Sequence, residues 1–124
     1  MGYHVLDPDG LAPTDDYPCD RRALSEAADL TTLHLARYTL RPGEQLARQY
    51  HYHQLREEAF YVLSGPLHVE TPDGEYVVET DSVFVAEPDS PHRAHNPADA
   101  DGPVTVLGTG APRTDPALAY DPEA

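Results

Sequence analysis

The fold is decided at residues 43–65, which read GEQLARQYHYHQLREEAFYVLSG, and at Pro91-His92 farther along the chain. His51 and His53 are separated by one residue, so in a β-strand both imidazoles point to the same face. Glu58 shares its parity with the apolar residues at positions 60 and 62, which places its carboxylate at one end of an inward-facing apolar row. We therefore predict that four side chains converge inside a β structure: His51, His53, Glu58 and His92.

This set of side chains is typical of a metal site. Three imidazoles and one carboxylate suit one divalent transition ion, and Zn, Mn, Fe, Ni, Co and Cu all remain open. Neutral imidazole is the form that binds, so metal binding should weaken below about pH 6.5, the ordinary pKa of histidine. Four protein ligands leave one position open on a five-coordinate ion and two on a six-coordinate ion, and a small-molecule ligand or substrate can bind there.

Short β-rich runs surround these motifs. They lie at residues 31–40, 59–63, 67–70, 75–79, 82–86 and 103–107. Gly and Pro separate the runs, and Asp73-Gly74 between two of them is the clearest hairpin signal. No segment carries helical periodicity long enough for a bundle. The sequence therefore predicts an all-β fold, either a barrel or a sandwich.

A chain of 124 residues is long enough for one domain with its own core and too short for two. We expect a short strand at residues 3–6 and an irregular arm within residues 1–30, with about two helical turns at 22–28. Residues 31–107 are expected to form the barrel. From Gly108 onward Gly, Ala, Pro and Asp dominate, which predicts an extended tail over residues 108–124.

The charge balance excludes some partners. The chain has 22 acidic residues and a formal net charge of −14, and its eight basic residues are all arginine. Such a charge argues against binding nucleic acid or an anionic membrane. An acidic chain without lysine also resembles the proteins of extreme halophiles, so we expect its stability to depend on salt. The absence of a long apolar run or a basic leader predicts a cytoplasmic protein. The lone Cys19 forms no internal disulfide and is expected to be inert.

The histidine motifs resemble those of the cupin superfamily. Gly43, the His-x-His pair, Glu58 and Gly65 match its first motif, with four residues between His53 and Glu58 and six between Glu58 and Gly65. His92 with Asn96 matches the end of its second motif. Two features differ: seven residues instead of five separate Gly43 from the first histidine, and Thr80 and Asp89 stand where Gly is typical. The resemblance covers roughly residues 31–107. It implies a small single-domain (cupin-2-like, RmlC-like) double-stranded β-helix of the jelly-roll type.

The resemblance also implies metal ligation by His51, His53, Glu58 and His92, and a homodimer. It leaves three interpretations open. The chain is a metal-dependent dioxygenase, isomerase, epimerase, decarboxylase or other lyase; or it is a non-catalytic module that senses, stores or binds a metal or small ligand; or the histidine cluster is incidental. An open metal position that faces an apolar pocket with a nearby base would favour the enzyme.

Several other residues compete with this ligand set. Glu57 points outward by parity, and His95 has the opposite strand parity to His92, so neither is expected to bind the metal. The remaining histidines are interpreted as surface or hydrogen-bonded residues: His4, His34 and His68.

Overall fold

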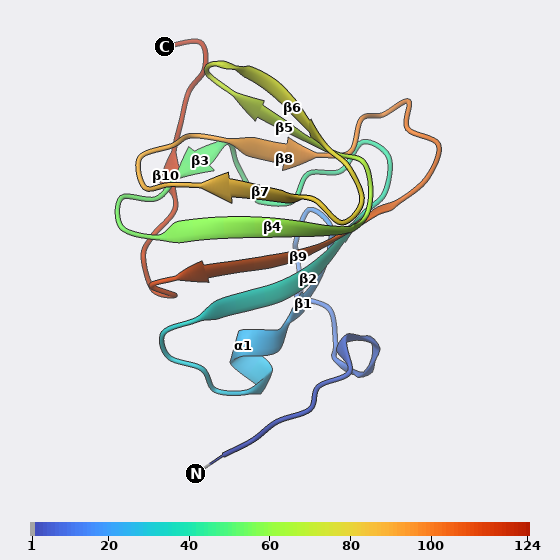
Figure 1. The fold of residues 1–124 in the computed structure, drawn as a ribbon, viewed down its shortest axis with the longest axis vertical. Helices are drawn as coiled ribbons and strands as arrows, with labels where there is room; N and C mark the ends of the chain where they lie inside the picture. Colours follow the sequence, from blue (N-terminus) through green and yellow to red (C-terminus); the bar gives the residue numbers. More distant parts are fainter. Residues whose placement is uncertain (1) are drawn as a thin grey trace.

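The computed structural model describes residues 2–124, which form two antiparallel β layers (Figure 1). The larger layer is a five-stranded sheet, whose strands in spatial order are β1 (Asp20–Ala23), β2 (His34–Leu40), β9 (Val104–Ala111), β4 (Glu57–Ser64) and β7 (Val83–Ala86). A three-stranded sheet contains β6 (Gly74–Val78), β5 (Leu67–Thr71) and β8 (Arg93–His95). A two-stranded ribbon pairs β10 (Leu118–Ala119) with β3 (His51–Tyr52). The all-β jelly-roll expectation is confirmed, although the sheets of the described chain do not join into a closed barrel.

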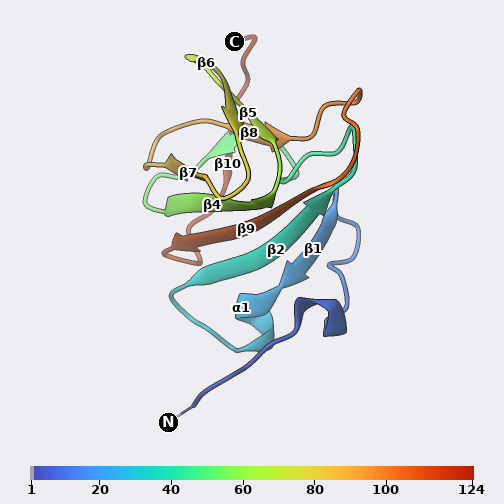
Figure 2. The same cartoon turned by 45° about the vertical axis from the view of Figure 1, so that its right-hand side comes forward.

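The core lies between the layers, where buried side chains of both sheets form one apolar cluster. The smaller sheet lies on the β4 and β7 side of the larger one, away from β1 (Figure 2). Burial alternates strictly along β2 and β9, as expected for strands with one face toward a core. Val62 and Val106 of the large sheet and Leu67 and Val69 of the small sheet are completely buried in one apolar cluster. This packing holds the two layers together and fixes which side chains point inward.

Most of the predicted strands are present, with ends shifted by a few residues. The Asp73-Gly74 hairpin joins β5 to β6, and Gly74 has a φ of +130°, which favours glycine. Residues 3–6 are not a strand, and a short 3-10 turn, η1 (Pro8–Gly10), follows them. The expected two helical turns are replaced by β1 and a single turn, α1 (Leu24–Ala27), because β1 pairs with β2.

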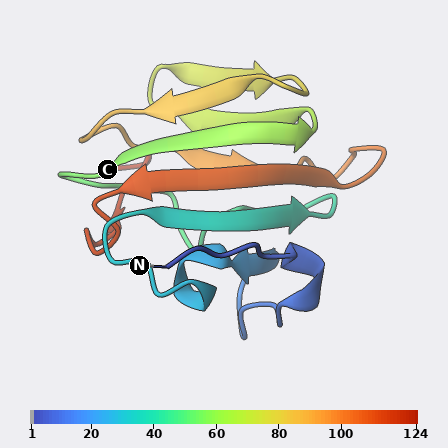
Figure 3. The ribbon, with the colours of Figure 1, turned by 60° about the horizontal axis from the view of Figure 1, so that its bottom comes forward.

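The largest difference concerns residues 108–124. β9 continues to Ala111 and lies between β2 and β4 (Figure 3), while β10 pairs with the histidine strand β3. The inward positions of β9 are Val104, Val106, Gly108 and Gly110. A Cβ at Gly108 would lie 2.7 Å from Cε1 of Tyr38, so glycine leaves room for that ring. The glycines whose composition predicted an extended tail are therefore buried, inward-facing positions of β9.

None of the helices in residues 2–124 has the length and apolar character needed to cross a membrane.

Candidate metal centre and adjoining pocket

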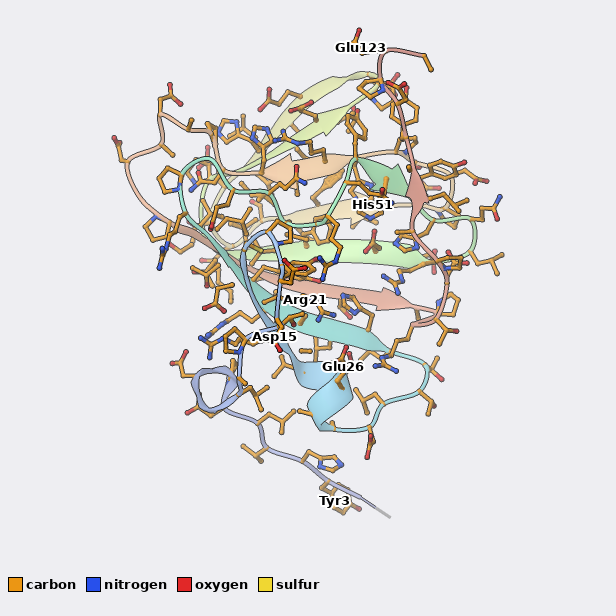
Figure 4. All side chains as sticks on the ribbon, turned by 180° about the vertical axis from the view of Figure 1, so that it is seen from behind. Tyr3, Asp15, Arg21, Glu26, His51 and Glu123 are labelled. Carbon is orange, nitrogen blue, oxygen red and sulfur yellow. The ribbon has the colours of Figure 1, made fainter. Side chains whose placement is uncertain are left out.

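The four predicted ligands lie together. Glu58 Oε1 is 3.2 Å from His92 Nε2, and it is 3.6 Å from Nε2 of both His51 and His53. Ligand atoms of His51, Glu58 and His92 form the tightest group, all within 4.8 Å of one another. All four side chains are buried, and His51 faces the interior in Figure 4. The structure thus brings together every residue of the predicted set, with His53 at its margin.

The nitrogen and oxygen atoms of this cluster fit a bound cation. His51 Nδ1 lies 3.0 Å from the Gln49 carbonyl oxygen, and His92 Nδ1 lies 2.8 Å from the Ser90 carbonyl oxygen. An Nδ1–H that donates to a carbonyl leaves Nε2 with a free lone pair. Within residues 2–124, His92 Nε2 and Glu58 Oε1 are buried without a hydrogen-bond partner. Buried polar atoms without partners are rare, and a divalent ion would satisfy both.

The backbone holds the two histidine motifs together. His51 and His92 form an antiparallel bridge, with N–H···O distances of 3.2 and 2.9 Å. The Asp89 N–H donates to the His53 carbonyl oxygen at 2.7 Å. Asp89 has a φ of +63°, and Asp81 has a φ of +66°. Asp89 replaces a glycine of the motif, and both aspartates adopt the left-handed backbone, which Asp tolerates better than most residues.

The carboxylate of Glu58 is held ionised. Burial opposes ionisation, but hydrogen bonds donated by His51 and His92 when their Nε2 atoms carry a proton, with a further contribution from the charge of His53, outweigh it and place the pKa of Glu58 far below its ordinary value. Burial also lowers the pKa of His53, so its imidazole is neutral near pH 7. An ionised carboxylate beside neutral imidazole is the protonation state that metal binding requires.

Two residues outside the predicted set support the centre, and one of them comes from the segment expected to be a tail. Asp115 Oδ2 lies 3.3 Å from His53 Nδ1, and the Asp115 side chain is only 5% exposed. The same oxygen accepts from the N–H groups of Leu55 and Arg56. Partial burial raises the pKa of Asp115, but these N–H groups and His53 lower it below its ordinary value. A carboxylate facing the distal nitrogen of a histidine orients that imidazole and makes it a better ligand.

Arg56 is the second supporting residue. Its Nη1 lies 3.5 Å from both Glu58 Oε2 and His53 Nε2, and its Nε donates to the Pro112 carbonyl at 3.1 Å. A further N–H donates to the Arg113 carbonyl. Arg56 therefore ties the chain after β9 to the cluster. The sequence gives no signal for the contact of Asp115 with His53 or for the contacts of Arg56 with the carbonyls of residues 112 and 113, because more than 50 residues separate the partners in each case.

Asp115→Asn is expected to weaken metal binding about 10- to 100-fold, the usual cost of losing an outer partner of a metal-bound histidine. Asparagine keeps the oxygen that accepts from the backbone but removes the charge facing His53. The affinity can be measured by competition with a coloured chelator. Asp101→Asn, on an exposed loop, is the matched control. Equal affinities for the two variants would contradict this role of Asp115.

A pocket of about 650 Å³ adjoins the cluster. His51, His53 and Glu58 line one part of it, and Phe60 and Leu46 add apolar surface. Residues from both flanking segments complete the wall: Thr14, Tyr17, Arg21 and Glu26 before β2, and Arg113, Thr114, Asp115 and Ala117 after β9. The candidate metal centre thus faces a hollow large enough for a small molecule.

His34 and Tyr38 form a buried polar pair in this pocket. His34 Nε2 lies 3.1 Å from the Tyr38 hydroxyl, and both side chains point inward from β2. In the sheet register His34 and Glu58 are both opposite Gly110, so about 10 Å of sheet separates their backbones. The sequence predicts that His34 is a surface or hydrogen-bonded residue. It is hydrogen-bonded, but it is buried in the pocket, which its β2 parity alone could not reveal.

Burial, with the nearby Arg56 guanidinium, lowers the pKa of His34 to about 4. Between pH 6.5 and 4 the unfolded chain therefore holds a proton that folded His34 lacks. The free energy of unfolding should fall by about 3 kcal/mol as the pH is lowered through this window, with no contribution from His34 above it. Urea unfolding at several pH values should show a shallower loss for His34→Gln. The same slope in both proteins would contradict the assignment.

The competing residues lie elsewhere, as expected. Glu57 is exposed. His95 points away from the cluster, and its Nε2 lies 3.4 Å from Glu75 Oε1, the same oxygen that contacts His68. Cys19 is buried, and desolvation raises the pKa of its thiol to about 12, so the thiolate is scarce at neutral pH.

Comparison with known proteins identifies the family. The cupin domain model matches residues 36–108. The protein SchB of Streptomyces halstedii is 32% identical over 110 residues, which cover 82% of this chain and 78% of SchB. The matches do not support the expected origin in an extreme halophile.

Solved structures agree with this at the level of the fold. A sugar phosphate isomerase of the cupin superfamily from Silicibacter pomeroyi superposes with a TM-score of 0.79 at 24% identity, covering 95% of this chain and 82% of the isomerase. The polyketide cyclase RemF from Streptomyces resistomycificus gives 0.76 at 17% identity, covering 98% and 90%. With its fold, its two histidine motifs and these matches in agreement, the chain belongs to the cupin domain family.

Proposed function

We propose that this cupin is a metal-dependent enzyme that moves a proton on a small molecule at the carbon next to a carbonyl group, as isomerases and cyclases do. One observation carries the proposal: a buried imidazole–phenol pair, His34 and Tyr38, lines the same pocket as three of the four candidate ligands, His51, His53 and Glu58. A metal centre alone would suit a storage or sensing module equally well. A nearby base that lines the same pocket favours catalysis.

The four candidate ligands His51, His53, Glu58 and His92 would hold one divalent transition ion. Such an ion supplies Lewis-acid polarisation of a carbonyl oxygen. The identity of the ion stays open. The affinity of a nitrogen and oxygen site depends mainly on which divalent metal is offered, so the ion that binds most tightly need not be the one that the reaction uses.

The side chains of the pocket divide the remaining work. Burial raises the pKa of Tyr38, so its hydroxyl keeps its proton, while His34 is neutral above about pH 4. We assign the Tyr38 hydroxyl as the group that contacts the substrate and His34 as the group behind it. As the Tyr38 oxygen takes the proton from the substrate carbon, it gives its own hydroxyl proton to His34 Nε2, the electron pair of the broken C–H bond stays on the substrate, and both transfers reverse when the proton is returned. Arg56, beside Glu58 and His53, provides a positive charge next to the carbonyl oxygen, where negative charge develops.

Oxygen chemistry is the weaker alternative. A dioxygenase needs an open metal position but no proton-transfer pair, so the His34–Tyr38 contact would have no role. Two enzymes with this fold, an isomerase and a cyclase, bear names that fit the proposal. At 24% and 17% identity their likeness shows the fold alone, and the proposal rests on the pocket.

Solvent exchange tests the proposal without knowledge of the full reaction. Small carbonyl compounds, including sugar phosphates, α-keto acids and β-polyketones, are incubated in D₂O with metal-loaded protein and followed by proton NMR. We expect deuterium to enter the carbon next to the carbonyl of at least one compound class, and a Glu58→Gln protein to lose this activity. Exchange no faster than with metal-free protein for every class would reject the proposal and favour the binding module.

We also propose that the chain forms a homodimer. The edge strands β6 and β7 expose apolar side chains: Tyr76, Val77, Val83 and Val85 are about half exposed or more. Exposed apolar edge strands favour pairing with another chain. Light scattering at high salt, which screens the repulsion between two acidic chains, should give twice the 13.6 kDa chain mass, and Val85→Glu should give a monomer. A monomeric wild-type protein would contradict the proposal.

A further inference from the structure

The pocket collects arginines, although basic residues are scarce in this chain. Acidic residues outnumber basic ones by 22 to 8. Even so, arginines from four separate segments line the pocket: Arg21, Arg48, Arg56 and Arg113. Two of the four, Arg21 and Arg113, lie outside the matched cupin domain at residues 36–108. Half of the arginines in this pocket therefore come from segments that are not part of the matched cupin domain.

Two of these guanidinium groups share one aromatic ring. The Cζ atoms of Arg21 and Arg48 lie 5.5 and 4.9 Å from the centroid of the Tyr17 ring. The Tyr17 hydroxyl donates to the Leu46 carbonyl at 2.9 Å, which fixes the ring at the pocket wall. Figure 4 shows Arg21 on the same open side of the large sheet as His51. Two like charges held beside one ring repel each other, and an anion between them would relieve that repulsion.

Carboxylates pair with two of these arginines, Arg21 and Arg56, and leave the other two without an ion pair in the part of the chain that the structure describes. Across residues 2–124, neither Arg48 nor Arg113 forms an ion pair. Arg48 donates to the Asp16 carbonyl oxygen at 2.5 Å, which positions the guanidinium without cancelling its charge. Arg21 has a single carboxylate partner, Glu26, at 3.9 Å, and the Glu26 side chain is 60% exposed. Unpaired arginines in so acidic a chain point to a ligand of negative charge.

Arg56 differs from the other three. Backbone carbonyls of residues 112 and 113 and the Glu58 carboxylate already occupy its donors. It belongs to the metal centre, as described above, so it leaves little for a second anion.

We infer that the pocket takes a carbonyl substrate that carries an oxyanion group, a carboxylate or a phosphate, and that Arg48 and Arg113 bind this group beside Arg21. The planar fork of a guanidinium matches both anions with paired hydrogen bonds. This inference rests on the proposed function, because it names the substrate class of the same pocket. Inorganic phosphate and pyruvate serve as the two probes, one for each anion.

Isothermal titration of each probe into metal-free protein tests the inference apart from the metal centre. Ionic strength is held constant with sodium chloride, and each probe is titrated into wild type, Arg48→Gln and Arg113→Gln. Arg41→Gln is the matched control, because Arg41 is exposed, has no ion pair within residues 2–124 and does not line the pocket. Arg48 is exposed as well, so its replacement leaves the core intact.

We expect wild type and Arg41→Gln to bind phosphate or pyruvate equally, and each pocket variant to bind at least about tenfold more weakly, the loss of one charge-assisted contact. The preferred probe identifies the anion. Failure of wild type to bind either probe, or equal weakening by Arg41→Gln, would overturn the inference. Deuterium exchange without anion binding would reject the inference and leave the proposed function standing. Anion binding by a protein that takes up no metal would reject the proposed metal-dependent function and leave the anion site standing.

Discussion

Glu58→Gln should abolish stoichiometric metal binding. The Glu58 carboxylate faces all three imidazoles through one oxygen, and it is the only member of the cluster that carries a negative charge. Its loss should weaken metal binding by more than the roughly 10- to 100-fold that follows removal of an outer partner. His51→Ala should have a comparable effect, because it removes a second member of the tightest group.

The loss of metal binding should also remove the stabilisation that the bound metal gives to the folded chain. An ion present at about 1,000 times its dissociation constant stabilises the folded chain by about 4 kcal/mol. Wild-type protein should therefore melt several degrees higher with metal than without, whereas Glu58→Gln should show almost no difference. Glu57→Gln is the matched control, since it makes the same chemical change at the adjacent exposed position. A metal-dependent rise of the melting temperature in Glu58→Gln equal to that of the control would show that Glu58 is not a ligand.

Tyr38→Phe should slow deuterium exchange by about 10²- to 10⁴-fold, the usual contribution of a positioned acid or base. The substitution removes only the hydroxyl, which contacts His34 and also hydrogen-bonds the Arg21 side chain, and leaves the ring beside Gly108. Metal content should stay unchanged, which separates this effect from that of Glu58→Gln. The folded state should lose about 1–3 kcal/mol, because His34 Nε2 is left buried without its partner.

Tyr61→Phe supplies the control for this second prediction. Its hydroxyl donates to Asp81 Oδ1 at 3.0 Å on the outside of β4, so its loss removes a tyrosine hydroxyl far from the pocket. Exchange rates that fall equally in both variants, or that stay at the wild-type level in Tyr38→Phe, would remove the imidazole–phenol pair from the mechanism.

The ligand cluster could be predicted from the sequence because its signals are local. Strand parity places His51 and His53 on one face and separates Glu58 from Glu57, and the structure agrees in each case. His92 needed the family resemblance, since nothing within its own segment shows that it reaches β3. The backbone bridge between residues 51 and 92 supplies that contact.

The pocket could not be predicted because distant segments build it. Tyr17 comes from the arm before β1, and its hydroxyl contacts Leu46, 29 positions away. Asp115 comes from the segment after β9 and contacts Leu55, 60 positions away. Composition misled the interpretation of Gly108 and Gly110, which lie inward on a paired strand. In that strand small residues create space beside Tyr38 and Arg56. A run rich in glycine is typical both of a turn or tail and of a strand whose inward side chains must be small, so composition alone does not distinguish the two.

Anomalous diffraction from crystals of the metal-loaded protein, recorded on both sides of the absorption edge of the ion, tests the central claim most directly. The account predicts one strong peak per chain, bounded by Nε2 of the three histidines and by the Glu58 carboxylate, and open toward the pocket that contains His34 and Tyr38. A peak elsewhere, for example beside His68 and His95, or no peak after loading with each candidate ion, would contradict it.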